Sequence, residues 1–199
     1  MKRKCGTAVS VLDCATLKTI MMAPTYEFRG AGSSKVTYAV RSKTSWCVVV
    51  YPRPGLARER FDFELTMLKR AVGCKNVVQL LGASSGKSTL KTCMAPSLIL
   101  ELAPHGSIVD LIDTLEFEGR RDEFSLAHVD AVIKEVENGL DQLQKLGYRH
   151  NDLRPQNVLV FFFNRLWPEK TRAKLCDLED CAPGPREDTG ALHAAILAL

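Results

Sequence analysis

The first half of the chain alternates short apolar runs with polar turns, which is the pattern of β-strands. Two runs, Val36–Val40 and Trp46–Val50, are rich in β-branched and aromatic residues and are bounded by Gly, Ser or Pro. Similar runs follow at Val77–Leu81 and Leu98–Leu102. Because short strands joined by turns usually pair with their neighbours, we expect an antiparallel sheet.

One helix is predicted inside this strand-rich half. From Arg58 to Val72 apolar residues recur every three or four positions, which gives one apolar stripe. The stripe consists of Phe61, Leu65, Leu68 and Val72. Glu64 lies beside it, so we expect this carboxylate to lie next to the buried face of the helix.

The second half is mainly helical. Apolar periodicity predicts a short helix over 107–115, a long helix over 125–146 that ends at Gly147, and a final helix over 189–199. Two apolar strands, 158–163 and 173–176, lie between the last two helices. This half therefore predicts a helical unit that contains a small hairpin.

The spacing of apolar residues changes from a strand-like to a helical pattern near residues 101–106, which predicts an α+β chain with two lobes. We expect an N-terminal extension over 1–25, a lobe with an antiparallel sheet and one helix over 26–103, and a shortened, mainly helical lobe over 104–199. The hydrophobic content of 46% is enough to bury a core in each lobe.

Composition and charge exclude several classes of protein. The net charge of +4 is spread along the chain without a basic stripe, so nucleic acid is not an expected partner. Seven cysteines form no C-x-x-C pair, which favours reduced thiols in the cytoplasm or nucleus. The N-terminus lacks a continuous apolar signal region, and no apolar stretch approaches the roughly 20 residues of a membrane span. We therefore expect neither secretion nor membrane insertion.

Three oxygen-bearing side chains carry the candidate chemistry. Asp152 and Asn157 lie five residues apart in the loop after the long helix, and Asp177 follows the strand 173–176. Phosphoryl transfer needs a carboxylate near the attacking hydroxyl and oxygen ligands for magnesium. We expect the three groups to converge on one divalent ion, although Asp and Asn are also common in turns and helix caps.

This loop resembles the catalytic loop of the protein kinases, H-R-D-L-x-x-x-N, and Asp177 resembles the Asp that opens their D-F-G motif. The resemblance implies a kinase-like fold that uses ATP and Mg²⁺. It implies that Asp152 is the catalytic base and that Asn157 and Asp177 bind the metal. Arg154 stands where many kinases place a phosphate-contacting lysine.

The first half carries a weaker resemblance to the same family. Glu64 lies on the one helix between strands, where kinases keep an ion-pairing Glu. The run 98–107 resembles the hinge that binds adenine and contains Glu101 and Ala103. Gly30 and Gly32 match the first two glycines of G-x-G-x-x-G, which covers the phosphates.

The lysine of the third kinase strand is missing, because V-V-V-Y stands where the family reads V-A-I-K. Tyr51 is thus predicted to occupy the position of the lysine. Arg53, two residues later, or Lys35, in the glycine-rich turn, could supply the cation instead. A lysine in that turn resembles the with-no-lysine kinases.

The segment after the metal-binding Asp is short. Asn151 replaces the Arg that pairs with a phosphorylated activation loop in many kinases, and ten residues separate Asp177 from Asp188. The docking platform for a peptide substrate is largely absent. The apolar tail 194–199 is predicted to be exposed and could drive self-association.

Three functions remain open at this stage. The first is a protein kinase that phosphorylates Ser or Thr on a protein substrate. The second is a pseudokinase that binds nucleotide or regulates a partner kinase. The third is a small-molecule kinase that resembles the aminoglycoside and choline kinases.

Overall fold

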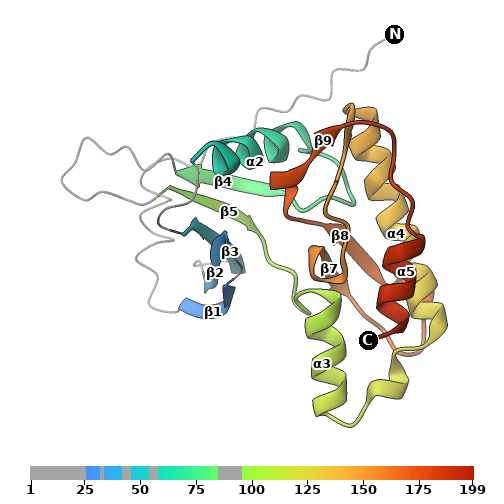
Figure 1. Ribbon diagram of the computed structural model, residues 1–199. Helices are drawn as coiled ribbons and strands as arrows, with labels where there is room; N and C mark the ends of the chain where they lie inside the picture. The colour runs from blue at the N-terminus through green and yellow to red at the C-terminus, as the bar shows by residue number, and fades with distance from the viewer. Residues whose placement is uncertain (1–25, 32–33, 42–45, 54–57, 85–95) are drawn as a thin grey trace. The chain divides into compact units, whose positions relative to one another are not determined.

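The computed structural model describes residues 26–31, 34–41, 46–53, 58–84 and 96–199 (Figure 1). The predicted extension over 1–25 therefore lies outside the described residues. Contacts divide the chain into two compact units. The first contains the described residues up to 73 together with 79–102, and the second contains 74–78 and 103–199.

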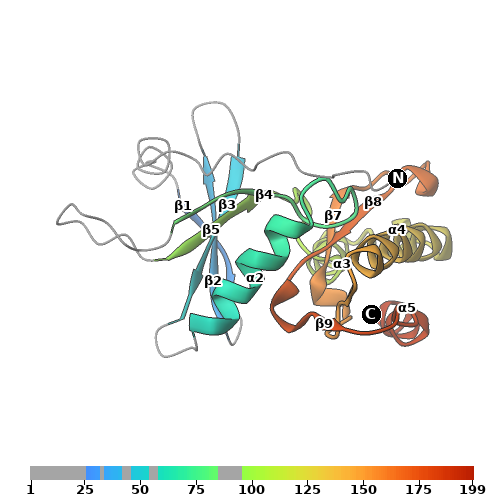
Figure 2. The same cartoon turned by 90° about the horizontal axis from the view of Figure 1, so that it is seen from above.

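The first unit is built on a five-stranded antiparallel sheet with the strand order β1-β2-β3-β5-β4. Its strands are β1 (Tyr26–Ala31), β2 (Lys35–Arg41), β3 (Trp46–Pro52), β4 (Leu80–Ser84) and β5 (Ser97–Glu101). The helix α2 (Arg58–Arg70) runs along one side of this sheet (Figure 2). Of the predicted apolar stripe, α2 buries Phe61 and Leu68, and it also buries Glu64 and Met67.

The two faces of this sheet carry different side chains. Residues opposite each other in neighbouring strands share a face, and the register pairs Val40 with Cys47 and Val49 with Ile99. These four side chains form a buried apolar cluster, and Tyr38 and Tyr51 pack against it.

The opposite face of the sheet begins with Lys35. Since side chains alternate along a strand, it also carries Thr37 of β2, which pairs with Val50 of β3. Val50 in turn pairs with Leu98 of β5, and both of these side chains are buried. Lys35, Thr37 and Val50 therefore share one face of the sheet.

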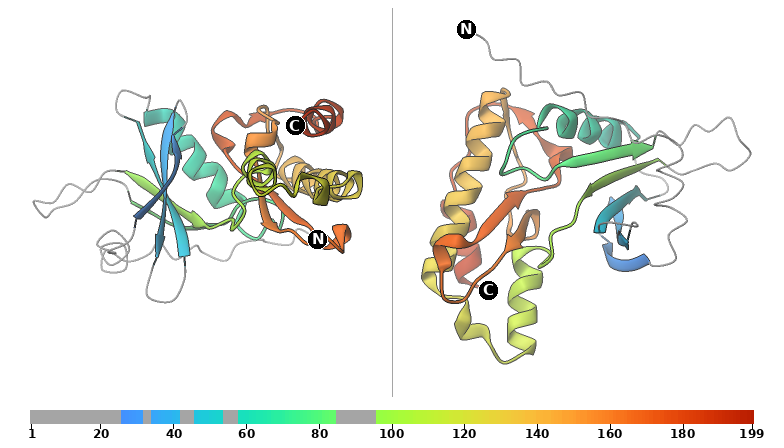
Figure 3. Two further views of the ribbon diagram at one scale, coloured as in Figure 1. Left: turned by 90° about the horizontal axis from the view of Figure 1, so that it is seen from below. Right: turned by 180° about the vertical axis from the view of Figure 1, so that it is seen from behind.

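The second unit contains three helices, a hairpin and several short turns. The helices are α3 (Ile108–Phe117), α4 (Leu126–Lys145) and α5 (Gly190–Leu197). The strand β7 (Val158–Phe162) pairs with β8 (Arg172–Leu175), and β6 (Tyr148–Arg149) pairs with β9 (Ala182–Pro183). The 3₁₀ turns are η1 (Arg121–Glu123), η2 (Pro155–Asn157), η3 (Pro168–Lys170) and η4 (Leu178–Asp180). α4 packs on β8 and against α5 (Figure 3).

Local chemistry sets the ends of the helices. Ser107 and Asp110 form a reciprocal capping box at the start of α3, which satisfies backbone groups that the helix leaves unpaired. Gly147 follows α4 with a φ of 89°, a left-handed conformation that favours glycine and stops a helix. The loop that carries the candidate catalytic residues therefore begins at a fixed point.

Residues 74–78 form a segment of the second unit that the sequence did not predict. The N–H of Leu175 donates to the carbonyl of Asn76 at 2.9 Å, and the N–H of Val78 donates to the carbonyl of Leu175 at 2.8 Å. The expected strand 77–81 is therefore wrong at its start, because Val77 bridges to β8 and β4 begins only at Leu80. Gly139 permits this packing, because a Cβ there would lie 2.8 Å from the carbonyl oxygen of Asn76.

The α+β class predicted from the sequence is confirmed by a sheet in one unit and helices in the other. Within the described ranges, no helix combines the length and the apolar content that crossing a membrane requires. The predicted exposed tail is only partly exposed. Ile196 is fully buried in the second unit, whereas Leu197 and Leu199 are exposed.

Candidate active site

The candidate catalytic loop follows β6 in the second unit and is tied to the end of β8. The buried side chain of His150 donates from Nε2 to the carbonyl oxygen of Cys176 at 2.7 Å, since a carbonyl can only accept. The N–H of Cys176 donates to the carbonyl oxygen of Asn157 at 3.0 Å. Two hydrogen bonds therefore hold the backbone just before Asp177 against the loop that carries Asp152 and Asn157.

The side chain of Asn157 is buried and oriented by Asp152. Its Nδ2 donates to the backbone oxygen of Asp152 at 2.9 Å and to Oδ2 of the same residue at 2.8 Å. With the NH₂ group committed to these acceptors, the amide oxygen of Asn157 remains as the atom that a metal ion would take.

Asp152 accepts a second side chain at the same oxygen. Nε of Arg154 lies 3.1 Å from Oδ2 of Asp152, and more than half of the Arg154 side chain is exposed. Asn157 and Arg154 therefore both contact Oδ2 of Asp152.

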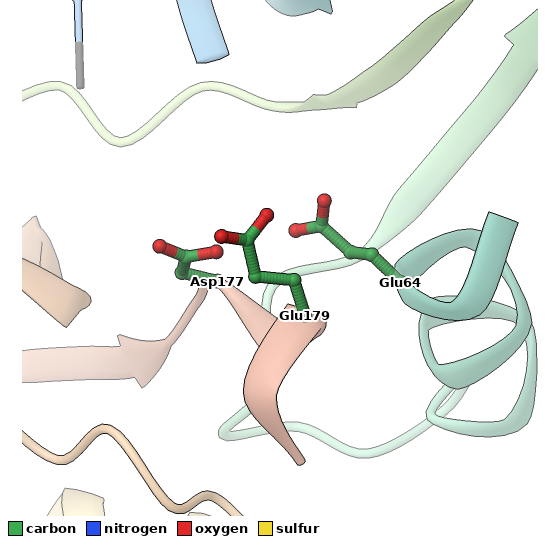
Figure 4. A group of neighbouring side chains, drawn as sticks. All are labelled: Glu64, Asp177 and Glu179. Atoms are coloured by element: carbon green, nitrogen blue, oxygen red, sulfur yellow. The ribbon is translucent and has the colours of Figure 1, made fainter. Parts of the chain in front are cut away.

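Asp177 follows β8 with left-handed backbone angles, φ 60° and ψ 66°. This conformation is uncommon for residues other than glycine and is concentrated at functional sites. Glu179 lies in the next turn, and its carboxylate is within 4.8 Å of that of Asp177 (Figure 4). The second unit thus offers only oxygen donors here, which is the donor set that Mg²⁺ prefers.

In the first unit, Lys35 and Glu64 form a buried ion pair. Nζ of Lys35 lies 2.7 Å from Oε2 of Glu64, and the side chains are 13% and 4% exposed. Glu64 projects from α2 (Figure 4). Burial of two charges is costly unless they pair, so each side chain stabilises the charged form of the other.

Tyr51 and Arg53 do not share this arrangement. Tyr51 pairs with Val36, so its side chain lies on the face opposite Lys35 and packs edge to face with Tyr38 at 6.1 Å between ring centroids. The β3 residues on the face of Lys35 are Val48, Val50 and Pro52, and Val50 directly precedes Tyr51. The register therefore separates Tyr51 from the Lys35–Glu64 pair, because a shift of one residue moves a side chain to the other face. Arg53 follows β3, is exposed, and donates its backbone N–H to the carbonyl of Ser34 at 2.9 Å.

The remaining predicted nucleotide contacts are only partly described. Gly30 lies in β1 beside an irregularity in the register, and a Cβ there would meet no atom within 4 Å. Gly32 lies outside the described residues. Oε1 of Glu101 accepts the N–H of Gln79 at 2.8 Å, and the carbonyl of the buried Ala103 accepts the N–H of Gly106 at 3.1 Å.

Glu187 is a residue of the site that the sequence did not single out. Its Oε2 accepts the N–H of His150 at 2.6 Å, and its Oε1 accepts the N–H of Asn151 at 2.7 Å. Asn151 has a φ of 67°, which Asn tolerates better than most residues. The sequence shows two adjacent acidic residues at 187–188. It does not show which of the two carboxylates contacts the loop.

Comparison with known proteins identifies the family. Residues 49–179, more than half of the chain, match the family described as protein tyrosine and serine/threonine kinase. The chain therefore belongs to the protein kinase superfamily, and its α+β architecture is a short version of the fold of that family.

The sequence identity to individual members of the family is low. MAP kinase-interacting serine/threonine-protein kinase 1 of Xenopus tropicalis is 27% identical over 131 residues, which is 66% of this chain and 28% of that protein. MAP kinase-interacting serine/threonine-protein kinase 2 of Xenopus laevis is 26% identical over 144 residues, 68% of this chain and 27% of that protein. A serine/threonine-protein kinase H1 homolog of Danio rerio is 31% identical over 104 residues, 52% of this chain and 22% of that protein. The chain thus spans about a quarter of the length of the curated relatives that it matches.

Proposed function

We propose that the chain is a protein kinase that transfers the γ-phosphate of ATP to a Ser or Thr hydroxyl of a protein. The observation that carries the proposal is the contact of Asp152 with two side chains, an ion pair with Arg154 and a hydrogen bond from Asn157, with the backbone before Asp177 bonded to the same loop. The relatives named above are serine/threonine-protein kinases, which supports this choice of acceptor.

In this proposal Asp152 orients the acceptor hydroxyl and takes its proton at Oδ1, while Asn157 and Arg154 hold the other carboxylate oxygen. Positioning is the main task, because phosphoryl transfer asks for little covalent chemistry from the protein. The fixed geometry of the loop would place the hydroxyl in line with the phosphorus.

The amide oxygen of Asn157 and the carboxylate of Asp177 would hold Mg²⁺, which supplies charge neutralisation for the phosphates. Lys35, oriented by Glu64, would contribute the second cation by binding phosphate oxygens. The sequence lacks the lysine of the third kinase strand. Lys35 would take its place, because it provides a largely buried ammonium that is paired with a carboxylate.

The test is transfer of labelled γ-phosphate from ATP to a generic basic protein, with and without Mg²⁺, by the wild-type chain and by Asp152→Ala. The proposal predicts transfer that needs Mg²⁺ and falls by about 10²-fold or more in the variant, as expected for the loss of a general base. A melting temperature that rises with ATP in both proteins, without transfer by either, would instead indicate a pseudokinase. Transfer only to a small hydroxylated acceptor would indicate a small-molecule kinase.

A further inference from the structure

The tip of the β7–β8 hairpin, residues 162–172, exposes large apolar side chains to water. Leu166 is 65% exposed, Trp167 is 48% exposed, and Phe162 at the end of β7 is 44% exposed. These three side chains come from a stretch of six residues. Large apolar side chains that are exposed together usually mark a surface that contacts a partner.

The same hairpin tip presents basic side chains at its outside. Arg165, Lys170 and Arg172 are all exposed, and Nζ of Lys170 lies over the ring of Trp167 at 4.4 Å from its centre. Arg165 pairs with Glu123 of η1, and Arg172 with Glu135 of α4. The two arginine side chains are 61% and 53% exposed, whereas the two glutamates are only 16% and 21% exposed. The carboxylates thus lie deeper than the guanidinium groups, and the outer layer of the tip is mainly positive.

The backbone of the hairpin tip makes its hydrogen bonds within the chain. Oδ1 of Asn164 accepts the N–H groups of Leu166 at 2.9 Å and of Trp167 at 3.2 Å. Pro168 has no N–H, and the N–H of Lys170 donates to the carbonyl oxygen of Trp167 at 3.0 Å. Lipid offers no groups that could replace hydrogen bonds to water, so a segment that enters lipid has to satisfy its own backbone. A protein partner could supply such groups itself, and the internal hydrogen bonds therefore favour lipid.

The root of the hairpin tip is fixed to the second unit. The ring of Phe163 packs on the rings of Phe124 and His128, with centroids 6.1 and 4.9 Å apart. Nε2 of His128 donates to the carbonyl oxygen of Asn164 at 3.1 Å, since a carbonyl can only accept. The turn η3 packs against α4 (Figure 2). The exposed side chains are therefore held outward before any partner arrives, which lowers the entropic cost of binding.

We propose that the hairpin tip contacts the surface of a membrane that contains anionic lipid. Leu166 and Trp167 enter the boundary between headgroups and acyl chains, and the three basic side chains contact lipid phosphate groups. Tryptophan beside basic residues is typical of that boundary. Only the tip of a hairpin leaves the water, so the contact is peripheral. It does not depend on the proposed kinase function, because it is measured without ATP.

The experiment measures binding of the full chain to unilamellar vesicles by co-sedimentation. One set of vesicles contains phosphatidylcholine alone, and the other contains phosphatidylcholine with phosphatidylserine. The variants Trp167→Ala and Lys170→Gln are compared with two matched controls. These are Phe28→Ala, which removes an exposed aromatic ring of β1, and Arg58→Gln, which removes an exposed charge of α2. Melting temperatures show whether each variant is folded.

The wild-type chain is expected to bind the vesicles that contain phosphatidylserine, and to bind less as salt screens the charges. Trp167→Ala should weaken binding about tenfold or more, because the burial of a large apolar side chain is lost. Lys170→Gln should weaken it about fivefold, and only where phosphatidylserine is present. Both controls should bind as the wild-type chain does.

Fluorescence tests the position of the tip directly, because the chain has two tryptophans, Trp46 and Trp167. Brominated lipids, which quench a tryptophan that they touch, should quench part of the fluorescence of the wild-type chain and none of that of Trp167→Phe. If Trp167→Ala did not fold, Leu166→Ala would take its place with the same expected direction.

Failure of the wild-type chain to bind either set of vesicles would overturn the proposal. Equal losses in Phe28→Ala and Trp167→Ala, or quenching that persists in Trp167→Phe, would overturn the assignment to the hairpin tip. Dimers that Trp167→Ala dissociates, without any vesicle binding, would assign the tip to a second copy of the chain instead.

Discussion

Two regions of the molecule carry the polar side chains that the kinase proposal uses, and they position them in different ways. One is the catalytic loop of the second unit, and the other is the β2–β3 hairpin of the first. The loop keeps Asp152 and Asn157 at the family's spacing and bonds them to each other directly. The hairpin has lost the lysine of β3 and carries the ammonium on β2, where Lys35 pairs with Glu64.

The difference follows from how each structure positions side chains. In a loop, the direction of a side chain depends on every backbone angle before it, so a functional residue cannot move along the chain without losing its place. In a sheet, neighbouring strands direct side chains to one common face, so a residue on β2 can replace one on β3. A sheet can thus accommodate the proposed relocation of a charge from β3 to β2, whereas the same shift along the loop would change the direction of the side chain.

The largest effect on turnover is expected at the proposed magnesium site, where a ligand cannot move along the chain without losing its position. Asp177→Asn removes a carboxylate from the proposed magnesium site and should lower turnover by about 10²-fold or more, since the metal contributes several kcal/mol to charge stabilisation. Asp122→Asn, an exposed change in η1, serves as the control. Turnover measured over a range of Mg²⁺ concentrations tests this. Unchanged turnover in Asp177→Asn would remove this residue from the site.

A smaller effect on stability is expected in the hairpin. Lys35→Met and Glu64→Gln each leave a buried partner without its counter-charge, and breaking a buried pair costs about 3–5 kcal/mol. The double variant should be more stable than the sum of the single losses predicts. Denaturant unfolding of the four proteins measures this coupling, and strictly additive losses would mean that the pair is not formed.

The smallest effect is expected at the left-handed residue of the loop. Asn151→Gly should leave the free energy of unfolding nearly unchanged, because glycine adopts a φ of 67° without strain. Asn151→Ala should be less stable by about 1 kcal/mol, since alanine keeps the Cβ that crowds the following carbonyl but lacks the short polar side chain that lets Asn adopt this conformation. Equal stabilities of the two variants would contradict the strained conformation.

The sequence predicted those parts of the site that depend on local spacing. Asp152 and Asn157 lie close together in the chain, and the turn η2 between them brings their side chains into contact. A run of apolar residues does not show which of its members shares a face with Lys35, so the sequence could not tell that Tyr51 lies on the opposite face. That question is settled only by the pairing of β2 with β3.

The role of Glu187 depends on contacts 36 and 37 residues apart in the chain. Such contacts come from the tertiary structure, in which the neighbouring residues Arg186 and Thr189 contact side chains of α4. The sequence pattern showed that this segment is short. It did not show that the segment bonds to the backbone of the catalytic loop.

The claim that Lys35 replaces the family's lysine is tested most directly by moving that lysine back to β3. Phosphate transfer would be measured for Lys35→Met alone and combined with Val50→Lys or Tyr51→Lys, with melting temperatures as a check on folding. We predict that Lys35→Met loses most activity and that only Val50→Lys restores part of it, because Val50 shares the face of Lys35 and Tyr51 does not. Full activity of Lys35→Met, or equal recovery with Tyr51→Lys, would contradict the account.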